Sequence, residues 1–303
     1  MYSLRDAKGF FISSLVLIFL IGCGGERHEH YVEVAELSYP GDYWQPAGVA
    51  VNEEDTVAVA DISEMSAVHL FDGSGVHTST VGGMGKEPGE LFVPIDVAFG
   101  PDGNLYAAEF GTKRVSVFSS DGTFIKALGE EALAKPFGVA AGDDGTVYVV
   151  DADPAELFVF GDDGKIKGRW GERLGLTGPE DVAYADGCLA VADSAGGRVV
   201  VTDEAGKTLR EIVPAGDPAP MPLEAAWGPD GELFVLAHAR AADAERGLES
   251  CVLVYDGDGK LSERVDVDMP SPGALAVDSH GGIFIADGPA HCVKIYAKRE
   301  VEE

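Results

Sequence analysis

Positive charge is scarce in this chain of 303 residues. It has 22 lysines and arginines against 52 aspartates and glutamates, which gives a formal net charge of −30. A field of this sign repels phosphate backbones and anionic lipid surfaces, so the composition argues against nucleic-acid binding. Small cations and basic partners are favoured instead.

Cysteine is also rare, with four in the whole chain. Setting aside Cys23 near the N-terminus leaves an odd number, which does not suit a full disulfide framework. Cys251 and Cys292 hold equivalent places in successive repeats, too far apart to be bridged. We expect Cys188, Cys251 and Cys292 to be small buried thiols.

Long hydrophobic runs are missing too. The apolar stretch Phe10–Ile21 is too short to span a bilayer comfortably, and Arg5 and Lys8 precede it, as in a secretory signal peptide. It leads into Leu20-Ile21-Gly22-Cys23, which resembles a bacterial lipobox. That resemblance implies cleavage before Cys23 and lipidation of its sulfur and new amino group. An uncleaved signal anchor is the alternative.

This interpretation divides the chain into a signal peptide (1–22), a lipidated tether (23–30) and a folded domain (31–298). The protein would then be exported and held on the membrane of the cell envelope by its lipid. Gly24, not aspartate, follows Cys23, so the signal for inner-membrane retention is missing. In a Gram-negative host we expect an outer-membrane, periplasm-facing lipoprotein.

The folded part repeats one unit six times. Each copy has an apolar segment led by a proline, a tight turn, a second apolar strand that usually ends in an acid, and a third strand closed by another turn. The leading prolines recur at intervals of roughly 45 residues, the length of a propeller blade: Pro46, Pro94, Pro136, Pro179, Pro222 and Pro272. Short strands of period two, about four to a unit, predict an all-β six-bladed propeller.

The repeat resembles the NHL-repeat family. Val147–Asp151, Arg114–Phe118 and the glycine-rich connector Gly82–Pro94 carry the similarity, which extends over about residues 31–297. The last repeat stops after its third strand at Val293–Tyr296, whereas the alternating segment Tyr31–Leu37 precedes the first proline without a repeat of its own. We predict that this N-terminal strand completes the last blade, which leaves no open edge.

An acid ends the second strand in five of the six repeats. Such a ring resembles a cation site, but a repeated acid is more economically a turn device whose carboxylate accepts backbone N–H groups. The sequence therefore favours a structural role for the set: Asp61, Glu109, Asp151, Asp193 and Asp287.

Three repeats depart from the pattern at its third position. Gly48, Gly138 and Gly273 stand there in three blades, and Asp96, Asp181 and Glu224 in the others. Because these carboxylates begin innermost strands, we expect them to converge on the mouth of the central channel. Such a set would suit a hard cation such as calcium. The alternative is that they merely hydrate the opening.

The fifth repeat carries an insertion from His238 to Ser250 on the same face. An insertion on a binding face is often functional, and Arg240 and Arg246 put positive charge beside an acidic mouth. His238, Arg240 and Arg246 are thus candidates for a partner-binding loop, with a solvated helical turn as the alternative.

Neither a three-histidine zinc site nor a nucleophile triad is visible in the sequence. We therefore expect a monomeric, non-catalytic scaffold that binds a protein or a small ligand at the propeller face. A metal-dependent hydrolase or lyase, with calcium or zinc, stays open. The NHL resemblance brings that alternative with it, because gluconolactonase and amidating-lyase propellers have related architectures.

Overall fold

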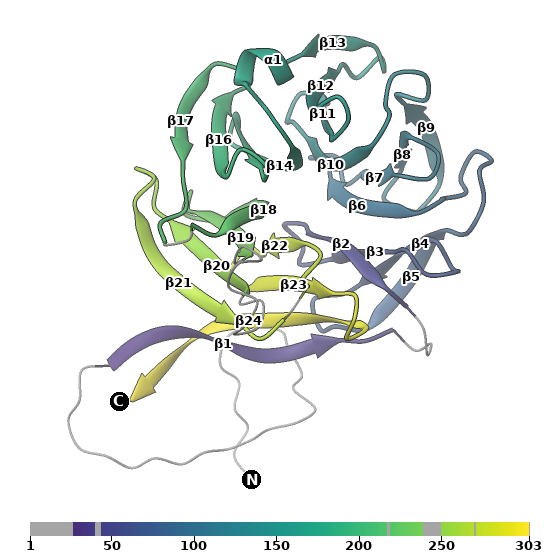
Figure 1. Cartoon of the computed structure of the whole chain (residues 1–303). Helices are drawn as coiled ribbons and strands as arrows, with labels where there is room; N and C mark the ends of the chain where they lie inside the picture. The colour runs from purple at the N-terminus through teal and green to yellow at the C-terminus, as the bar shows by residue number, and fades with distance from the viewer. Residues whose placement is uncertain (1–26, 40–43, 217–218, 239–249, 270, 303) are drawn as a thin grey trace.

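The computed structural model describes residues 27–39, 44–216, 219–238, 250–269 and 271–302. These residues form six four-stranded antiparallel sheets arranged as blades around a central axis (Figure 1). The first strand of each blade lies toward the middle of the ring and the fourth toward its outside. The predicted six-bladed β-propeller is confirmed.

Blades 1 to 3 follow the chain. Blade 1 contains β2 (Pro46–Val51), β3 (Val57–Asp61), β4 (Ala67–Phe71) and β5 (His77–Gly82). Blade 2 contains β6 (Pro94–Phe99), β7 (Leu105–Glu109), β8 (Arg114–Phe118) and β9 (Phe124–Leu128). Blade 3 contains β10 (Pro136–Ala141), β11 (Val147–Asp151), β12 (Glu156–Phe160) and β13 (Ile166–Arg169), followed by the single helical turn α1 (Gly171–Leu174).

Blades 4 to 6 continue this order. Blade 4 contains β14 (Pro179–Ala185), β15 (Cys188–Asp193), β16 (Arg198–Asp203) and β17 (Thr208–Ile212). Blade 5 contains β18 (Met221–Trp227), β19 (Leu233–His238), β20 (Ser250–Tyr255) and β21 (Leu261–Val267). Blade 6 contains β22 (Leu275–Val277), β23 (Ile283–Asp287), β24 (Cys292–Glu302) and the N-terminal strand β1 (Arg27–Leu37).

The N-terminal strand closes the ring as predicted. β1 pairs with β24 in an antiparallel register that runs from Arg27 opposite Glu302 to Leu37 opposite Val293. Both strands are longer than expected: β1 includes residues 27–30 of the predicted tether, and β24 continues through the charged tail. Backbone pairing does not require apolar side chains, so a polar sequence does not prevent the two strands from pairing at these ends.

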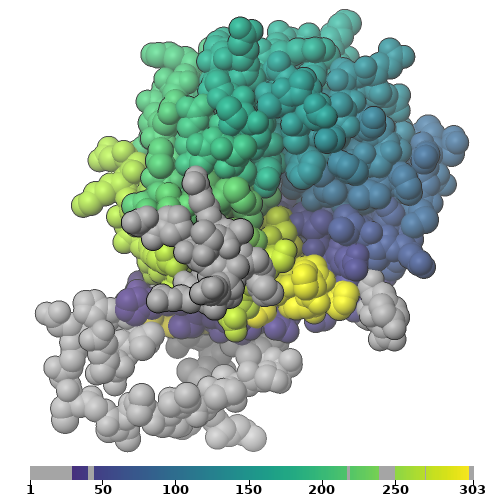
Figure 2. Space-filling view, viewed as in Figure 1, coloured from purple at the N-terminus to yellow at the C-terminus, as the bar shows by residue number. Residues whose placement is uncertain are grey.

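The core lies between neighbouring blades. Each of the second strands β3, β7, β11 and β23 has five residues, and all of them are buried. Adjacent blades cover both faces of these strands. The outer strands β9 and β17 are mostly accessible to solvent. In the space-filling view, the blades drawn in blue and teal pack against one another without a gap (Figure 2).

The cysteines in the described residues form no disulfide, as expected. Cys251 and Cys292 are buried, whereas Cys188 is half-buried, so the expectation of burial is wrong for Cys188. Its place at the start of β15, next to the turn, leaves it open on one side. None of the helices within the described ranges is long and apolar enough to cross a membrane.

Candidate functional site

A cavity of about 360 Å³ lies at the mouth of the central channel, and every blade contributes to its lining. The contributing residues begin the first strands or belong to loops beside them: Ala47, Ile95, Asp96, Phe110, Phe137, Glu180, Glu224 and Gly273. Among these described residues, three are carboxylates and none is basic. The cavity therefore offers a negative field to a ligand, with an apolar wall on one side.

Two of the predicted acids also bond to a neighbouring blade. The carboxylate of Asp96 accepts the backbone N–H of Val139 at 2.8 Å, and the carboxylate of Asp181 accepts that of Ala225 at 2.9 Å. Asp181 is only 5% exposed and does not line the cavity, so it lies beneath the surface of the site. Each of these two side chains thus links the innermost strand of its own blade to that of the next blade by a hydrogen bond.

The glycines of the same repeat position explain how the strands come so close. A Cβ atom on Gly48 would lie 2.6 Å from Cα of Asp96, and one on Gly138 would lie 2.7 Å from Cα of Asp181. Such distances are too short for any side chain. At these two contacts the glycine is therefore a packing requirement of the ring. Gly273 differs from the sequence-based alignment: it directly follows Pro272, at the second position of its repeat, and a Cβ there would lie 2.8 Å from the carbonyl oxygen of Ala47.

Glu224 differs from the two aspartates. It lines the cavity, and no hydrogen bond joins its carboxylate to another residue in the described part of the chain. Glu180, which the sequence did not single out, lines the same cavity from blade 4. Glu224 is thus the acid with most freedom to meet a ligand, because the Glu180 carboxylate also interacts with the side chain of Ser194.

Burial and mutual repulsion make ionisation of the acids at this site unfavourable. Burial raises the pKa of Asp181 to about 6, and burial and the Asp181 charge hold the pKa of Asp96 well above its usual range. Burial, followed by the charges of Asp181, Asp96 and Glu180, does the same to the pKa of Glu224. A bound cation would relieve this repulsion.

An aromatic pair forms the apolar wall. Phe110 of the β7–β8 loop meets Phe137 of β10 edge to face, with ring centroids 6.1 Å apart. Phe110 remains 41% exposed. Its backbone N–H bonds to the carbonyl of Val93, whose φ of 56° is an outlier for a β-branched residue. The hydroxyl of Ser66 accepts the N–H of Val93 at 2.8 Å and holds this conformation.

The repeated acids that end the second strands have the structural role that the sequence favoured. All five are buried. Asp61, for example, accepts the N–H of Gln45 in the connector before its blade and that of Ser63 in the loop after it, both at 2.8 Å. Glu109, Asp151 and Asp193 likewise bond to the preceding connector, and Asp287 to the following loop.

Of the partner-loop candidates, the structure describes only His238. This residue ends β19 instead of lying in a loop, because its backbone pairs with Met221 and Ser250. Burial lowers the pKa of its imidazole, and Nε2 has no hydrogen-bond partner among the described residues. Arg240 and Arg246, like Cys23, lie outside the described ranges.

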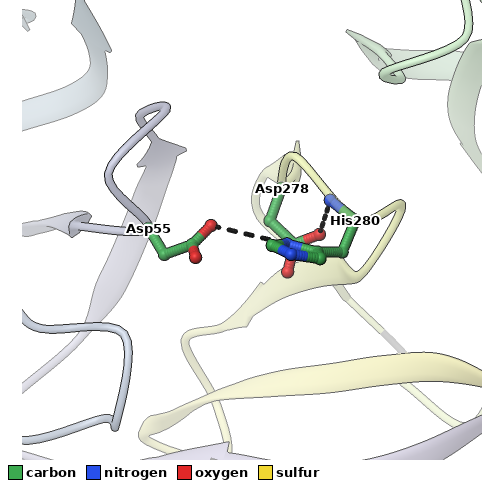
Figure 3. Close-up of side chains that lie close together, drawn as sticks. All are labelled: Asp55, Asp278 and His280. Atoms are coloured by element: carbon green, nitrogen blue, oxygen red, sulfur yellow. Dashed lines mark hydrogen bonds and ion pairs between the residues drawn. The ribbon is translucent and has the colours of Figure 1, made fainter. Parts of the chain in front are cut away.

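A different group of possible metal ligands lies in two hairpins of blades 1 and 6 (Figure 3). The ligand atoms of Asp55, Asp278 and His280 all lie within 4.8 Å of one another, which within the described ranges is not true of Asp96, Asp181 and Glu224 together. However, the carboxylate of Asp278 accepts the N–H groups of His280 and Gly282 at 2.8 and 2.7 Å. We therefore assign the Asp278 carboxylate a structural role in the β22–β23 turn.

Comparison with known proteins supports the fold and leaves the family open. No protein-family model matches the chain, and no curated protein sequence does. Solved propellers do match. A streptogramin B lyase aligns with a TM-score of 0.64 at 12% identity, over 89% of this chain and 98% of its own.

Two further structures align equally well. A gluconolactonase from Xanthomonas campestris has a TM-score of 0.63 at 15% identity, over 90% of this chain and 100% of its own. A virginiamycin B lyase from Staphylococcus aureus, solved with quinupristin, has a TM-score of 0.62 at 16% identity, over 91% of this chain and 89% of its own. At these identities the similarity establishes the propeller architecture alone.

Proposed function

We propose that this protein is a non-catalytic binding protein of the NHL-repeat type, held on the cell envelope by a lipid on Cys23, and that its channel mouth binds a positively charged organic group. The group would be an amine or guanidinium of a small ligand or of a protein partner. The observation that carries the proposal is a cavity to which the described residues contribute three carboxylates and no basic side chain.

The lining favours an organic cation over a bare metal ion. An organic cation has an apolar part, which suits Phe110 and Phe137, and aromatic faces attract ammonium groups. Calcium requires six to eight oxygen ligands at about 2.3–2.6 Å. Asp96 and Asp181 already accept backbone N–H groups, which leaves Glu224 and Glu180 as the principal acceptors.

The test uses the full chain solubilised in detergent and two probes, spermidine and calcium, titrated by calorimetry. We expect spermidine to bind at one site. Glu224→Gln should weaken this binding about tenfold or more, because a charge-assisted hydrogen bond contributes about 1.5–3 kcal/mol. The matched control is Glu131→Gln, an exposed acid in the connector between blades 2 and 3, which should leave binding unchanged.

The alternative is a metal-dependent hydrolase or lyase, and the lyases and gluconolactonase among the similar folds favour it. Asp96, Glu180 and Glu224 would be its oxygen ligands. Stoichiometric calcium or zinc in elemental analysis of the purified protein, lost on Glu224→Gln, would support this alternative. Tight calcium binding without spermidine binding would refute the organic-cation proposal.

The anchor is tested separately. Cys23→Ser should move the protein from the membrane fraction to the soluble fraction, and Cys188→Ser should leave it on the membrane. Mass spectrometry that finds an intact Met1 terminus on the mature protein would contradict the proposed processing.

A further inference from the structure

A second cavity, of about 250 Å³, lies between blades 3 and 4. The β10–β11 turn bounds it on one side and the β16–β17 turn on the other. These turns lie at the opposite ends of the strands from Pro136 and Asp151, which flank the channel mouth. The cavity is therefore separate from the proposed cation site and shares no residue with it.

One polar group in this cavity has no hydrogen-bond partner among the described residues. Tyr148 is 2% exposed, and its hydroxyl bonds to no other described residue, although the side chain lines the cavity. The neighbouring Tyr184 stacks against it with ring centroids 6.0 Å apart, and its own hydroxyl donates to Glu204 at 2.8 Å. The ring of Tyr148 is buried, but its hydroxyl opens into the cavity and is available to a ligand.

Trp170 completes an aromatic wall beside Tyr148. The two ring centroids are 6.0 Å apart at an angle of 49°. The guanidinium of Arg173 lies 4.9 Å from the centroid of the Trp170 ring, in a cation–π contact. Trp170 is half-buried and can meet the apolar face of a small ring, whereas the ring of Tyr148 is covered by Trp170 and Tyr184.

The remaining polar groups are of both kinds. Lys167 donates, the carboxylates of Asp144 and Glu204 accept, and the hydroxyl of Thr146 does either. A sugar hydroxyl also donates and accepts, so it can pair with each of these groups. The channel mouth, by contrast, offers acceptors alone among its charged groups.

We propose that the cavity between blades 3 and 4 is a saccharide-binding site, in which one sugar ring lies against Trp170 and its hydroxyls pair with Lys167, Glu204 and the Tyr148 hydroxyl. Small-molecule sites commonly combine aromatic side chains with convergent polar groups, and this cavity has both. This site is independent of the proposed cation-binding function.

The experiment uses the full chain in a detergent without a sugar headgroup, with glucose and N-acetylglucosamine as probes. Saturation-transfer difference NMR should show saturation of the ring protons of at least one sugar. Tyr148→Phe, which keeps the ring and removes only the hydroxyl, should weaken binding by about three- to tenfold. Trp170→Ala should abolish it, with the fold checked by circular dichroism.

The chain offers a matched control. Tyr106 holds the position of Tyr148 in blade 2 and is 5% exposed, but it does not line this cavity. Tyr106→Phe should leave sugar binding unchanged, as should Glu224→Gln. Absence of binding by both sugars, or equal weakening by Tyr106→Phe and Tyr148→Phe, would overturn the proposal.

Discussion

The carboxylate of Asp181 bonds to the backbone N–H of Ala225, so a side chain of blade 4 holds the first strand of blade 5. Asp96 makes the same contact from blade 2 to Val139 of blade 3. Both acids therefore stabilise the ring through an acceptor oxygen, while their charges are buried near one another. The hydrogen bond and the charge act in opposite directions and can be separated by mutation.

Asp181→Asn should stabilise the protein at neutral pH. The amide oxygen still accepts the N–H of Ala225, and the buried charge is gone. Folding raises the pKa of Asp181 from 3.8 to about 6, so its ionisation costs on the order of 3 kcal/mol in the folded state. This group stabilises the fold fully below about pH 3.8, and that contribution is lost as the pH rises through about 6. In urea unfolding, Asp181→Asn should raise the free energy of unfolding at about pH 7.5 and leave it unchanged at about pH 4.

The control is Asp186→Asn, which changes an exposed acid in the same blade and should give no pH-dependent difference. A lower free energy of unfolding for Asp181→Asn at about pH 7.5 would mean that the ionised carboxylate is needed for the bond to Ala225.

Removal of a repeated acid should have the opposite effect. Asp193 accepts the N–H groups of Thr177 and Gly178 and lies beside Arg198. Asp193→Ala leaves these donors without a partner in a buried place and should cost about 3–5 kcal/mol. Thermal unfolding measures this loss. Asp163→Ala in an exposed hairpin should change the melting temperature little, and a similarly small change for Asp193→Ala would contradict the structural role.

The sequence was sufficient for the fold because the repeat is visible in it. Turn residues and period-two strands recur with each leading proline, and the unpaired segment Tyr31–Leu37 indicated how the ring closes. The ends of β1 and β24 were missed because their charged residues pair through the backbone, which leaves no apolar pattern. His238 was placed in a loop because this polar residue follows the apolar part of its strand, although its backbone continues the pairing.

The site was only partly predictable. The break in the repeat pointed to Asp96, Asp181 and Glu224, and all three begin innermost strands. Their different surroundings depend on the neighbouring blade: two meet a backbone N–H, and one lines the cavity without such a bond. Phe137 and Glu180 follow the leading prolines of their repeats, a position that did not stand out because its residue type varies from blade to blade, and Phe110 reaches the cavity from the β7–β8 loop.

Closure of the ring by β1 predicts a position-dependent effect within one strand. Leu37 is 3% exposed and packs in the cluster shared by blades 6 and 1, whereas Val32 is 36% exposed. Leu37→Ala should lower the free energy of unfolding by about 2–5 kcal/mol. Val32→Ala should lower it by less than about 1 kcal/mol. Equal effects in denaturant unfolding would show that β1 is not docked as described.

Cation binding at the channel mouth should release protons. Asp96, Asp181, Glu180 and Glu224 face this region, and burial raises the pKa of each, followed for Asp96 and Glu224 by repulsion from neighbouring carboxylates. The cation favours their ionised forms, so spermidine affinity should rise as the pH increases through about 6, where Asp181 titrates. Calorimetry at about pH 6 in two buffers of different ionisation enthalpy counts the protons.

Glu224→Gln should reduce the number of protons released, and Glu131→Gln should not. Proton uptake, or affinity independent of pH, would show that spermidine does not bind beside these carboxylates.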